Sequence, residues 1–208
     1  MRNDDARALL VLAHGAGAGM RHPFMESLSR ALGKNGIATF RYQFPYMEAD
    51  RFRPDPPRVL EGVVRAAVER AHELALGLPL FAGGKSMGGR MTSNAAAHGG
   101  LPFVRAIVFF GFPLHPAKKP SAERAAHLAE VTLPMLFLQG ARDDLADLGL
   151  LGPIIERLGA RASLQVIPEA SHAFEVPKRT GHTHEDIVDQ LARLAADFML
   201  KCAAEGGA

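Results

Sequence analysis

The sequence predicts an α/β protein, with a doubly wound, mainly parallel sheet of six strands and helices on both faces. Three observations lead to this fold class. Six short apolar runs recur along the 208 residues, and amphipathic stretches with helical periodicity lie between them. Several runs are apolar almost throughout, as strands must be when helices bury both of their faces. Strands that alternate with helices form parallel sheets, because each crossover returns the chain to the same end.

The apolar runs are the predicted strands, and each is followed by a turn. In chain order they are "ALLVLA" (8–13), "IATFRY" (37–42), "LPLFAG" (78–83), "VRAIVFF" (104–110), "LPMLFLQ" (133–139) and "ASLQVIP" (162–168). In a parallel sheet of this kind, functional groups follow the carboxyl ends of the strands. The residues just after each run are therefore the first candidates for a site.

Two of the remaining stretches have the periodicity of amphipathic helices. The first carries an apolar stripe, with Glu61, Arg65 and Glu69 on the opposite face at i, i+4 spacing. That stripe consists of Leu60, Val63, Val64, Ala67, Val68, Ala71 and Leu74. The last helix has a similar stripe, made of Ile187, Leu191, Leu194 and Phe198. At its start, Thr183 precedes Asp186 by three residues, which resembles a capping box.

The composition predicts one globular domain over residues 1–208. The net charge is +2 with both signs interspersed, so there is no electrostatic reason to expect a nucleic-acid or membrane partner. The apolar run 8–13 is too short for a signal-peptide core or a membrane span. The single cysteine, Cys202, excludes an intrachain disulfide and fits a reducing compartment. We therefore expect a soluble cytoplasmic protein.

The stretch "GGKSMGGR" (83–90) has the features of a nucleophile elbow. Ser86 follows the third predicted strand and precedes a helical pattern, with Gly84 and Gly88 two residues to either side. Glycines there allow strand and helix to approach while the serine backbone is strained. The helix N-terminus behind the serine also favours developing negative charge. Ser86 is the predicted nucleophile.

A serine needs a base to accept its proton, and the base needs an acid to orient it. His172 follows the sixth run in "IPEASH", and Asp143 follows the fifth in "LQGARDD". The chain order Ser86, Asp143, His172 is typical of a catalytic triad at the edge of such a sheet. The neighbouring Asp144 is an alternative acid, with capping of the following helix as its other possible role.

Backbone N–H groups at two places are candidates for an oxyanion hole. Met87 follows the nucleophile, and the first run ends in "AHGAGAG", which suggests Ala16 or Gly17 as the second donor. No metal or cofactor is expected. His182 and His184 lie at the start of the last helix without an acidic partner at suitable spacing. His14 is interpreted as a hydrogen-bonding turn residue, and Lys85 and Arg90 as solvated charges.

The segment between the fourth and fifth runs is too short for a lid domain, because only 22 residues separate positions 110 and 133. The pocket is therefore expected to be shallow. The aromatic residues proposed to edge it are Tyr42, Phe44, Tyr46, Phe112 and Phe174. Packing in the core is the alternative interpretation of the same residues.

The chain resembles a small dienelactone-hydrolase-like α/β-hydrolase, of the branch that contains the hydrolase-like domain of an NSL chromatin complex subunit. The similar stretches are "HGAGAGMRHPFM", "FRYQFPY", "GGKSMGGRM", "FFGFPLHP", "LFLQGARDDL" and "SHAFEVPK", between about residues 10 and 178. The family's G-x-x-D pattern favours Asp143 over Asp144. In two respects the chain departs from the family. Ser86 stands where dienelactone hydrolases have cysteine, and the opening antiparallel hairpin of larger relatives is expected to be absent.

Together these patterns predict a serine hydrolase of small soluble esters or thioesters, which works through an acyl-enzyme. Its partner would be a small-molecule substrate, and the sequence specifies no oligomeric state. A lactonase or peptidase on the same fold is an alternative. So is an interaction module that retains the site without using it, since the branch it resembles includes a scaffold subunit.

Overall fold

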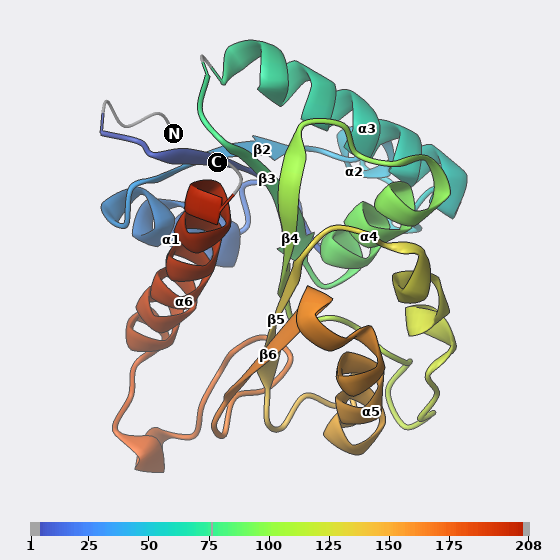
Figure 1. Ribbon diagram of the computed structural model, residues 1–208. Coiled ribbons are helices and arrows are strands. Elements are labelled where there is room, and N and C mark those ends of the chain that lie inside the picture. Colours follow the sequence, from blue (N-terminus) through green and yellow to red (C-terminus); the bar gives the residue numbers. More distant parts are fainter. Residues whose placement is uncertain (1–4, 76, 206–208) are drawn as a thin grey trace.

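The computed structural model describes residues 5–75 and 77–205, which form one sheet of six parallel strands with helices on both faces (Figure 1). The strands lie in the order β2-β1-β3-β4-β5-β6, and every neighbouring pair is parallel. They are β1 (Ala8–Ala13), β2 (Ile37–Tyr42), β3 (Leu80–Lys85), β4 (Val104–Phe110), β5 (Met135–Gly140) and β6 (Ala162–Ile167). The predicted fold class is confirmed, and none of these strands is antiparallel.

The helices lie in two layers around the sheet. In Figure 1, α1 and α6 cover one face, and α3, α4 and α5 cover the other. The α-helices are α1 (Pro23–Lys34), α2 (Pro45–Glu48), α3 (Pro57–Leu74), α4 (Met87–Gly99), α5 (Leu148–Leu158) and α6 (His184–Glu205). The 3₁₀ helices are η1 (Glu123–Glu130), η2 (Gly159–Arg161) and η3 (Lys178–Thr180). In the segment between β4 and β5, η1 contributes Ala125 and Leu128 to the core, so the segment packs as part of the domain.

Two strands begin later than the apolar runs predict. The runs 78–83 and 133–139 start two residues before β3 and β5, which begin directly after Pro79 and Pro134. A proline lacks the N–H that a ladder hydrogen bond needs, although its carbonyl still accepts one. Accordingly, Pro79 O accepts from Leu9 N at 2.9 Å and Pro134 O accepts from Ile107 N at 2.9 Å. β3 in turn continues to Lys85, so Ser86 comes directly after its last residue.

One of the two edge strands, β6, and one helix face differ from their sequence patterns. β6 has a single neighbour, β5, and Ser163, Gln165 and Val166 are exposed, so it is not covered like the central strands. The prediction that Glu61 lies on the polar face of its helix is wrong. Glu61 is buried, and its Oε2 lies 3.2 Å from His98 Nδ1, because α4 packs against this side of α3.

The long C-terminal helix α6 closes the face that α1 also covers. Its apolar side buries Ile187, Val188, Leu191, Ala192, Ala195, Ala196 and Met199. The capping box is confirmed at its start: Asp186 Oδ2 accepts from Thr183 N at 2.7 Å, and Thr183 Oγ1 accepts from Asp186 N at 3.1 Å. Within residues 5–75 and 77–205, no helix has the length and apolar character required to cross a membrane.

The burial of α6 predicts an unequal effect of the same substitution at two leucines. Leu191 is fully buried against the sheet, whereas Leu74 at the end of α3 is 49% exposed. Leu191→Ala should lower the free energy of unfolding by about 2–5 kcal/mol, because it leaves a cavity. Leu74→Ala should change it by less than about 1 kcal/mol. Urea unfolding followed by circular dichroism measures both, and equal losses would contradict this packing.

Candidate active site

Ser86 lies in a sharp turn between β3 and α4. Its backbone has φ 51° and ψ −119°, a conformation that side-chain-bearing residues rarely adopt. Ser86 N donates to Phe110 O at 3.2 Å, which joins the turn to the end of β4. The side chain is partly exposed at the carboxyl edge of the sheet. The serine is therefore held in a strained conformation that presents its hydroxyl.

Two glycines make this turn possible because the backbones around them are in close contact. A Cβ on Gly84 would lie 2.6 Å from Ala13 O, and a Cβ on Gly88 would lie 2.5 Å from His14 O. Real Cβ atoms do not approach a carbonyl oxygen that closely. The spacing of glycines around Ser86 thus follows from the packing of β3 and α4 against the end of β1.

The structure brings together the three residues of the predicted triad. Ser86 Oγ lies 2.8 Å from His172 Nε2, and His172 Nδ1 lies 2.7 Å from Asp143 Oδ2. The three residues follow β3, β6 and β5, which end at the same edge of the sheet. Because an ionised carboxylate can only accept, Nδ1 carries the proton and Nε2 is free to accept the hydrogen of the serine hydroxyl.

Three hydrogen-bond partners hold the carboxylate of Asp143 in place. Its side chain is fully buried, Oδ1 accepts from Leu145 N at 2.8 Å, and Oδ2 accepts from the amide of Gln139 as well as from His172. Gln139 is itself fixed, since its Oε1 accepts from Phe112 N at 2.9 Å. Sequence reasoning missed Gln139. Its signal was that it is the one polar side chain in the fifth apolar run.

Asp144, the alternative acid, is exposed and lies outside this chain of hydrogen bonds. It does not cap the next helix either. Asp147 is the N-cap of α5, and its Oδ1 accepts from Gly149 N at 2.7 Å. Of the two neighbouring carboxylates, only Asp143 is in contact with His172.

The candidate oxyanion donors come from the start of α4 and from the loop after β1. Met87 is the first residue of α4, where a backbone N–H has no acceptor within its own helix. Ala16 lines the cavity next to Ser86 together with Gly15 and Ala18, whereas Gly17 does not line it. The geometry therefore favours Ala16 over Gly17 as the partner of Met87.

The cavity at Ser86 has a volume of about 320 Å³ and a mainly apolar wall. It is lined by Gly15, Ala16, Ala18, His22, Phe24, Met25, Lys85, Ser86, Leu145, His172 and Ala173. Sequence reasoning missed Phe24, Met25 and Leu145. The first two lie in the stretch "MRHPFM" after the glycine-rich loop, and Leu145 directly follows the two aspartates.

The prediction that five aromatic residues edge the pocket is wrong. Tyr42, Phe44, Tyr46, Phe112 and Phe174 are all buried, and none lines the cavity. The first three pack on one another, with ring centroids 5.3 Å and 6.4 Å apart, in the cluster beneath α3 and α4. Phe112 packs on Phe109 and Phe137 of the central strands. The alternative interpretation of core packing is the correct one.

His14, which lies outside the predicted triad, is held in the core by hydrogen bonds. His14 is fully buried, its Nδ1 donates to Gly15 O at 2.9 Å and its Nε2 accepts from Phe44 N at 3.0 Å. Burial lowers the pKa of His14, which is consistent with a neutral ring in a turn. Among the described residues, no group of three or more His, Cys, Asp or Glu side chains could hold a metal ion.

Lys85 and Arg90 are not the solvated charges that their position suggests. Both side chains are partly buried, and Lys85 Nζ donates to His172 O at 2.8 Å. Burial lowers the pKa of both groups, and the nearby Arg124 also contributes to the lower pKa of Arg90. The prediction that both charges are solvated is wrong, because neighbouring elements cover both residues.

A second serine–histidine pair occurs in the core. Ser93 Oγ lies 2.8 Å from His127 Nε2, but Ser93 is fully buried and its hydroxyl donates to Arg90 O at 2.9 Å. Nε2 must therefore carry the proton in this contact, so His127 acts as a donor to Ser93. Burial, Arg90 and His98 lower the pKa of His127 to about 4. The pair joins η1 to α4, and neither residue lines the cavity at Ser86.

The comparison with known proteins agrees with this architecture. A family model described as an alpha/beta hydrolase domain matches residues 6–200. Among solved structures, dienelactone hydrolase from Anabaena variabilis superposes with a TM-score of 0.72 and 23% identity, over 94% of this chain and 87% of that chain. An alpha-beta serine hydrolase homologue from Coxiella burnetii has a TM-score of 0.72 and 18% identity, over 91% and 85% of the two chains.

A third similar structure is a serine hydrolase without a lid from Xanthomonas campestris. Its TM-score is 0.70 at 19% identity, over 97% of this chain and 85% of that chain. At these identities the three structures show a shared fold. The predicted resemblance to a dienelactone-hydrolase-like protein is supported, and the narrower placement beside the NSL complex subunit stays a prediction.

The close contacts of the elbow predict opposite effects of alanine at two helical glycines. Gly88→Ala should destabilise the protein, because its Cβ would lie 2.5 Å from His14 O. Gly62→Ala in α3 has open space for its Cβ and should stabilise the protein by about 0.5–1 kcal/mol. Thermal unfolding of the two variants measures this difference. A Gly88→Ala protein as stable as the Gly62→Ala protein would rule out the described approach.

Proposed function

Because the chain belongs to the family of alpha/beta hydrolase domains, we propose that it is a serine hydrolase that cleaves small esters or thioesters. The observation that carries the proposal is the continuous chain of hydrogen bonds from Ser86 Oγ through His172 to Asp143, with distances of 2.8 Å and 2.7 Å. It joins a nucleophile, a base and an orienting acid in the order that serine hydrolysis requires.

In the first half of the reaction, Ser86 Oγ attacks the acyl carbon while His172 Nε2 takes the hydroxyl proton. Asp143, which accepts the other ring N–H, stabilises the imidazolium that forms. The tetrahedral intermediate collapses as the bond to the leaving group breaks, and His172 returns the proton to the departing alcohol or thiol. The acyl group remains on Ser86 as an ester.

In the second half, water takes the place of the alcohol or thiol. His172 accepts a proton from the water, whose oxygen attacks the acyl carbon, and then returns that proton to Ser86 Oγ as the acid departs. Backbone N–H groups of Met87 and Ala16 are the proposed donors to the oxyanion in both halves. Loss of one such donor typically lowers turnover about 10²- to 10³-fold.

The cavity supports a small acyl group. Its volume of about 320 Å³ lies near the lower limit for ligand pockets, and Phe24, Met25 and Leu145 make its wall mainly apolar. An acyl chain of a few carbons or a single aromatic ring fits these dimensions. The one described helix between β4 and β5 packs in the core, so a substrate need not displace a separate domain.

The proposal predicts selective labelling of one serine by a fluorophosphonate. Ser86 Oγ should displace fluoride from phosphorus, and mass spectrometry of a digest should find the adduct on the peptide that contains Ser86. Ser86→Ala and His172→Ala should remove the labelling. Ser93→Ala is the matched control, because Ser93 also contacts a histidine but does not line the cavity, and it should label like the wild type.

Two results would contradict the assignment of the nucleophile. Labelling that persists in Ser86→Ala would mean that another side chain reacts. A folded wild-type protein that does not react at all would favour the alternative of an interaction module with an idle site.

The neighbouring aspartates provide a second matched pair. Asp143→Asn should reduce turnover of p-nitrophenyl acetate by about 10⁴-fold, because the ring loses its orienting charge and takes the wrong tautomer. Asp144→Asn should retain the wild-type rate, since Asp144 is exposed and outside the hydrogen-bonded chain. Circular dichroism should show both variants folded. A large loss in Asp144→Asn, with Asp143→Asn active, would reverse the choice of acid.

A further inference from the structure

Lys85 connects the strand that bears the nucleophile to the loop that bears the base. It is the last residue of β3, directly before Ser86. Its side chain crosses to the loop after β6, where Nζ donates to the backbone oxygen of His172 at 2.8 Å. The two residues are 87 positions apart in the sequence. The Lys85 side chain therefore connects the backbone next to the proposed nucleophile with the backbone of the proposed base.

The ammonium group lies near two aromatic rings. Nζ lies 5.9 Å from the centroid of Phe24 and 5.4 Å from the centroid of Phe174, within the range of a cation–π contact with each ring. The two rings are stacked on each other, 5.9 Å apart. A Cβ on Gly111 would lie 3.3 Å from Nζ and 3.5 Å from ring atoms of His172, so the end of β4 approaches both groups.

The ammonium group of Lys85 lies in this site without a direct ion pair, and burial on balance disfavours its charge. Among the described residues, no carboxylate lies within 4.0 Å of Nζ, and the ammonium is stabilised by the ring faces and by the carbonyl dipole of His172. Asp143 acts on it from the end of β5, and His172 and His22 line the same cavity. Desolvation lowers the pKa of Lys85 to about 8, although the charge of Asp143 opposes this shift.

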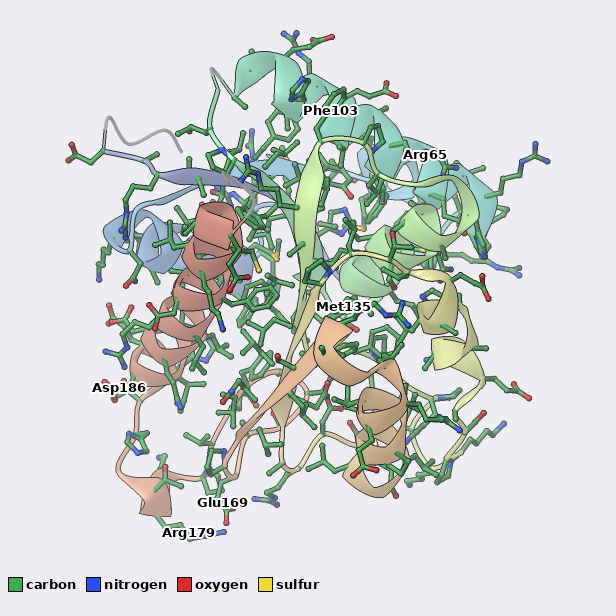
Figure 2. The ribbon with its side chains drawn as sticks, in the orientation of Figure 1. Arg65, Phe103, Met135, Glu169, Arg179 and Asp186 are labelled. Atoms are coloured by element: carbon green, nitrogen blue, oxygen red, sulfur yellow. The ribbon has the colours of Figure 1, made fainter. Side chains whose placement is uncertain are left out.

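The ring of His172 contacts Ser86 and Asp143, but its main chain has little other support. The loop that carries it follows β6, an edge strand with a single neighbour. Hydrogen bonds hold the residues on either side: Arg142 N donates to Ala170 O at 2.8 Å, and Ser171 N donates to Glu175 O at 2.9 Å. Farther out, Arg179 of η3 pairs with Glu169 at 2.8 Å, and both are labelled at the lower edge of Figure 2. Among residues 5–75 and 77–205, Lys85 is the group that forms a hydrogen bond with the main chain of His172 itself.

We propose that Lys85 is a positioning residue, whose ammonium group holds the main chain of His172 so that the ring stays aligned between Ser86 and Asp143. The inference rests on the proposed serine hydrolysis. A displacement of a catalytic ring by a fraction of an ångström lowers the rate steeply, because proton transfer depends on hydrogen-bond geometry. Lys85 acts on the reaction through His172, and its charge makes its hydrogen bond stronger than that of a neutral donor.

The test replaces Lys85 by methionine, which keeps the length of the side chain but removes the charge and the donor. With p-nitrophenyl acetate at pH 7, Lys85→Met should lower kcat at least about 10-fold and leave KM unchanged. The rate constant of fluorophosphonate labelling should fall by a similar factor. Lys178→Met is the matched control, because Lys178 is an exposed lysine in the same connection and should behave like the wild type.

The pH profile separates positioning from a structural role. In the wild type, kcat should decline about 5-fold as pH rises through about 8, because the neutral amine is a weaker donor and loses its attraction to the rings. Lys85→Met should lack this alkaline decline, and Lys178→Met should retain it. Return of each sample from pH 9 to pH 7 should restore the rate, which excludes unfolding as the cause.

Three outcomes overturn the inference. The first is a wild-type kcat that stays level between pH 7 and pH 9, a measurement that needs no variant to fold. The second is a Lys85→Met protein whose labelling rate equals that of the wild type. The third is an alkaline decline that persists in Lys85→Met. A wild-type protein that the fluorophosphonate does not label at all would instead contradict the proposed function, so the two failures are distinguishable.

Discussion

The close contact between the end of β1 and the turn from β3 into α4 is the constraint on which the site depends. At Gly84 and Gly88 this contact leaves no room for a Cβ, and the backbone of Ser86 is forced to φ 51° between them. The strain is sustained because the central strands are packed by helices on both faces. The parallel order of the strands then brings the loops after β5 and β6 to the same edge, where Asp143 and His172 lie.

Hydrogen bonds from neighbouring groups orient the charged side chains at this edge. Gln139 and Leu145 donate hydrogen bonds to the carboxylate of Asp143. The ring of His172 is hydrogen-bonded to Asp143, and its main-chain oxygen accepts a hydrogen bond from Lys85. Gln139, Asp143 and Leu145 belong to β5 and the loop after it, whereas Lys85 ends β3 and His172 follows β6. A buried carboxylate and a partly buried ammonium are stable so close together because each has its own hydrogen-bond partners. These polar contacts lie at one side of a cavity whose wall is mainly apolar.

Sequence reasoning failed where burial depends on what another element covers. Tyr42 ends β2, and Phe44 and Tyr46 follow it closely. Aromatic residues at that position suit a pocket rim as well as a core, and only the packing of α3 and α4 places them in the core. Glu61 and Lys85 carry charges that are typical of a surface. Glu61 is buried because α4 lies against α3, and Lys85 is partly buried beside the stacked rings of Phe24 and Phe174. Contacts of this kind join residues far apart in the chain.

Local patterns in the amino-acid sequence specify the fold class, the order and approximate bounds of the strands, the turn at Ser86 and the residues now found hydrogen-bonded to it. The patterns concerned are apolar periodicity, glycine spacing and the position of polar residues after strand ends. The packing of elements in space distinguishes Asp143 from Asp144 by contact and favours Ala16 over Gly17. It also determines which residues line the cavity, and it reveals the contacts of Gln139 and Lys85. The physical reason is that hydrogen-bond geometry and desolvation are set by neighbours in space, which a single sequence does not specify.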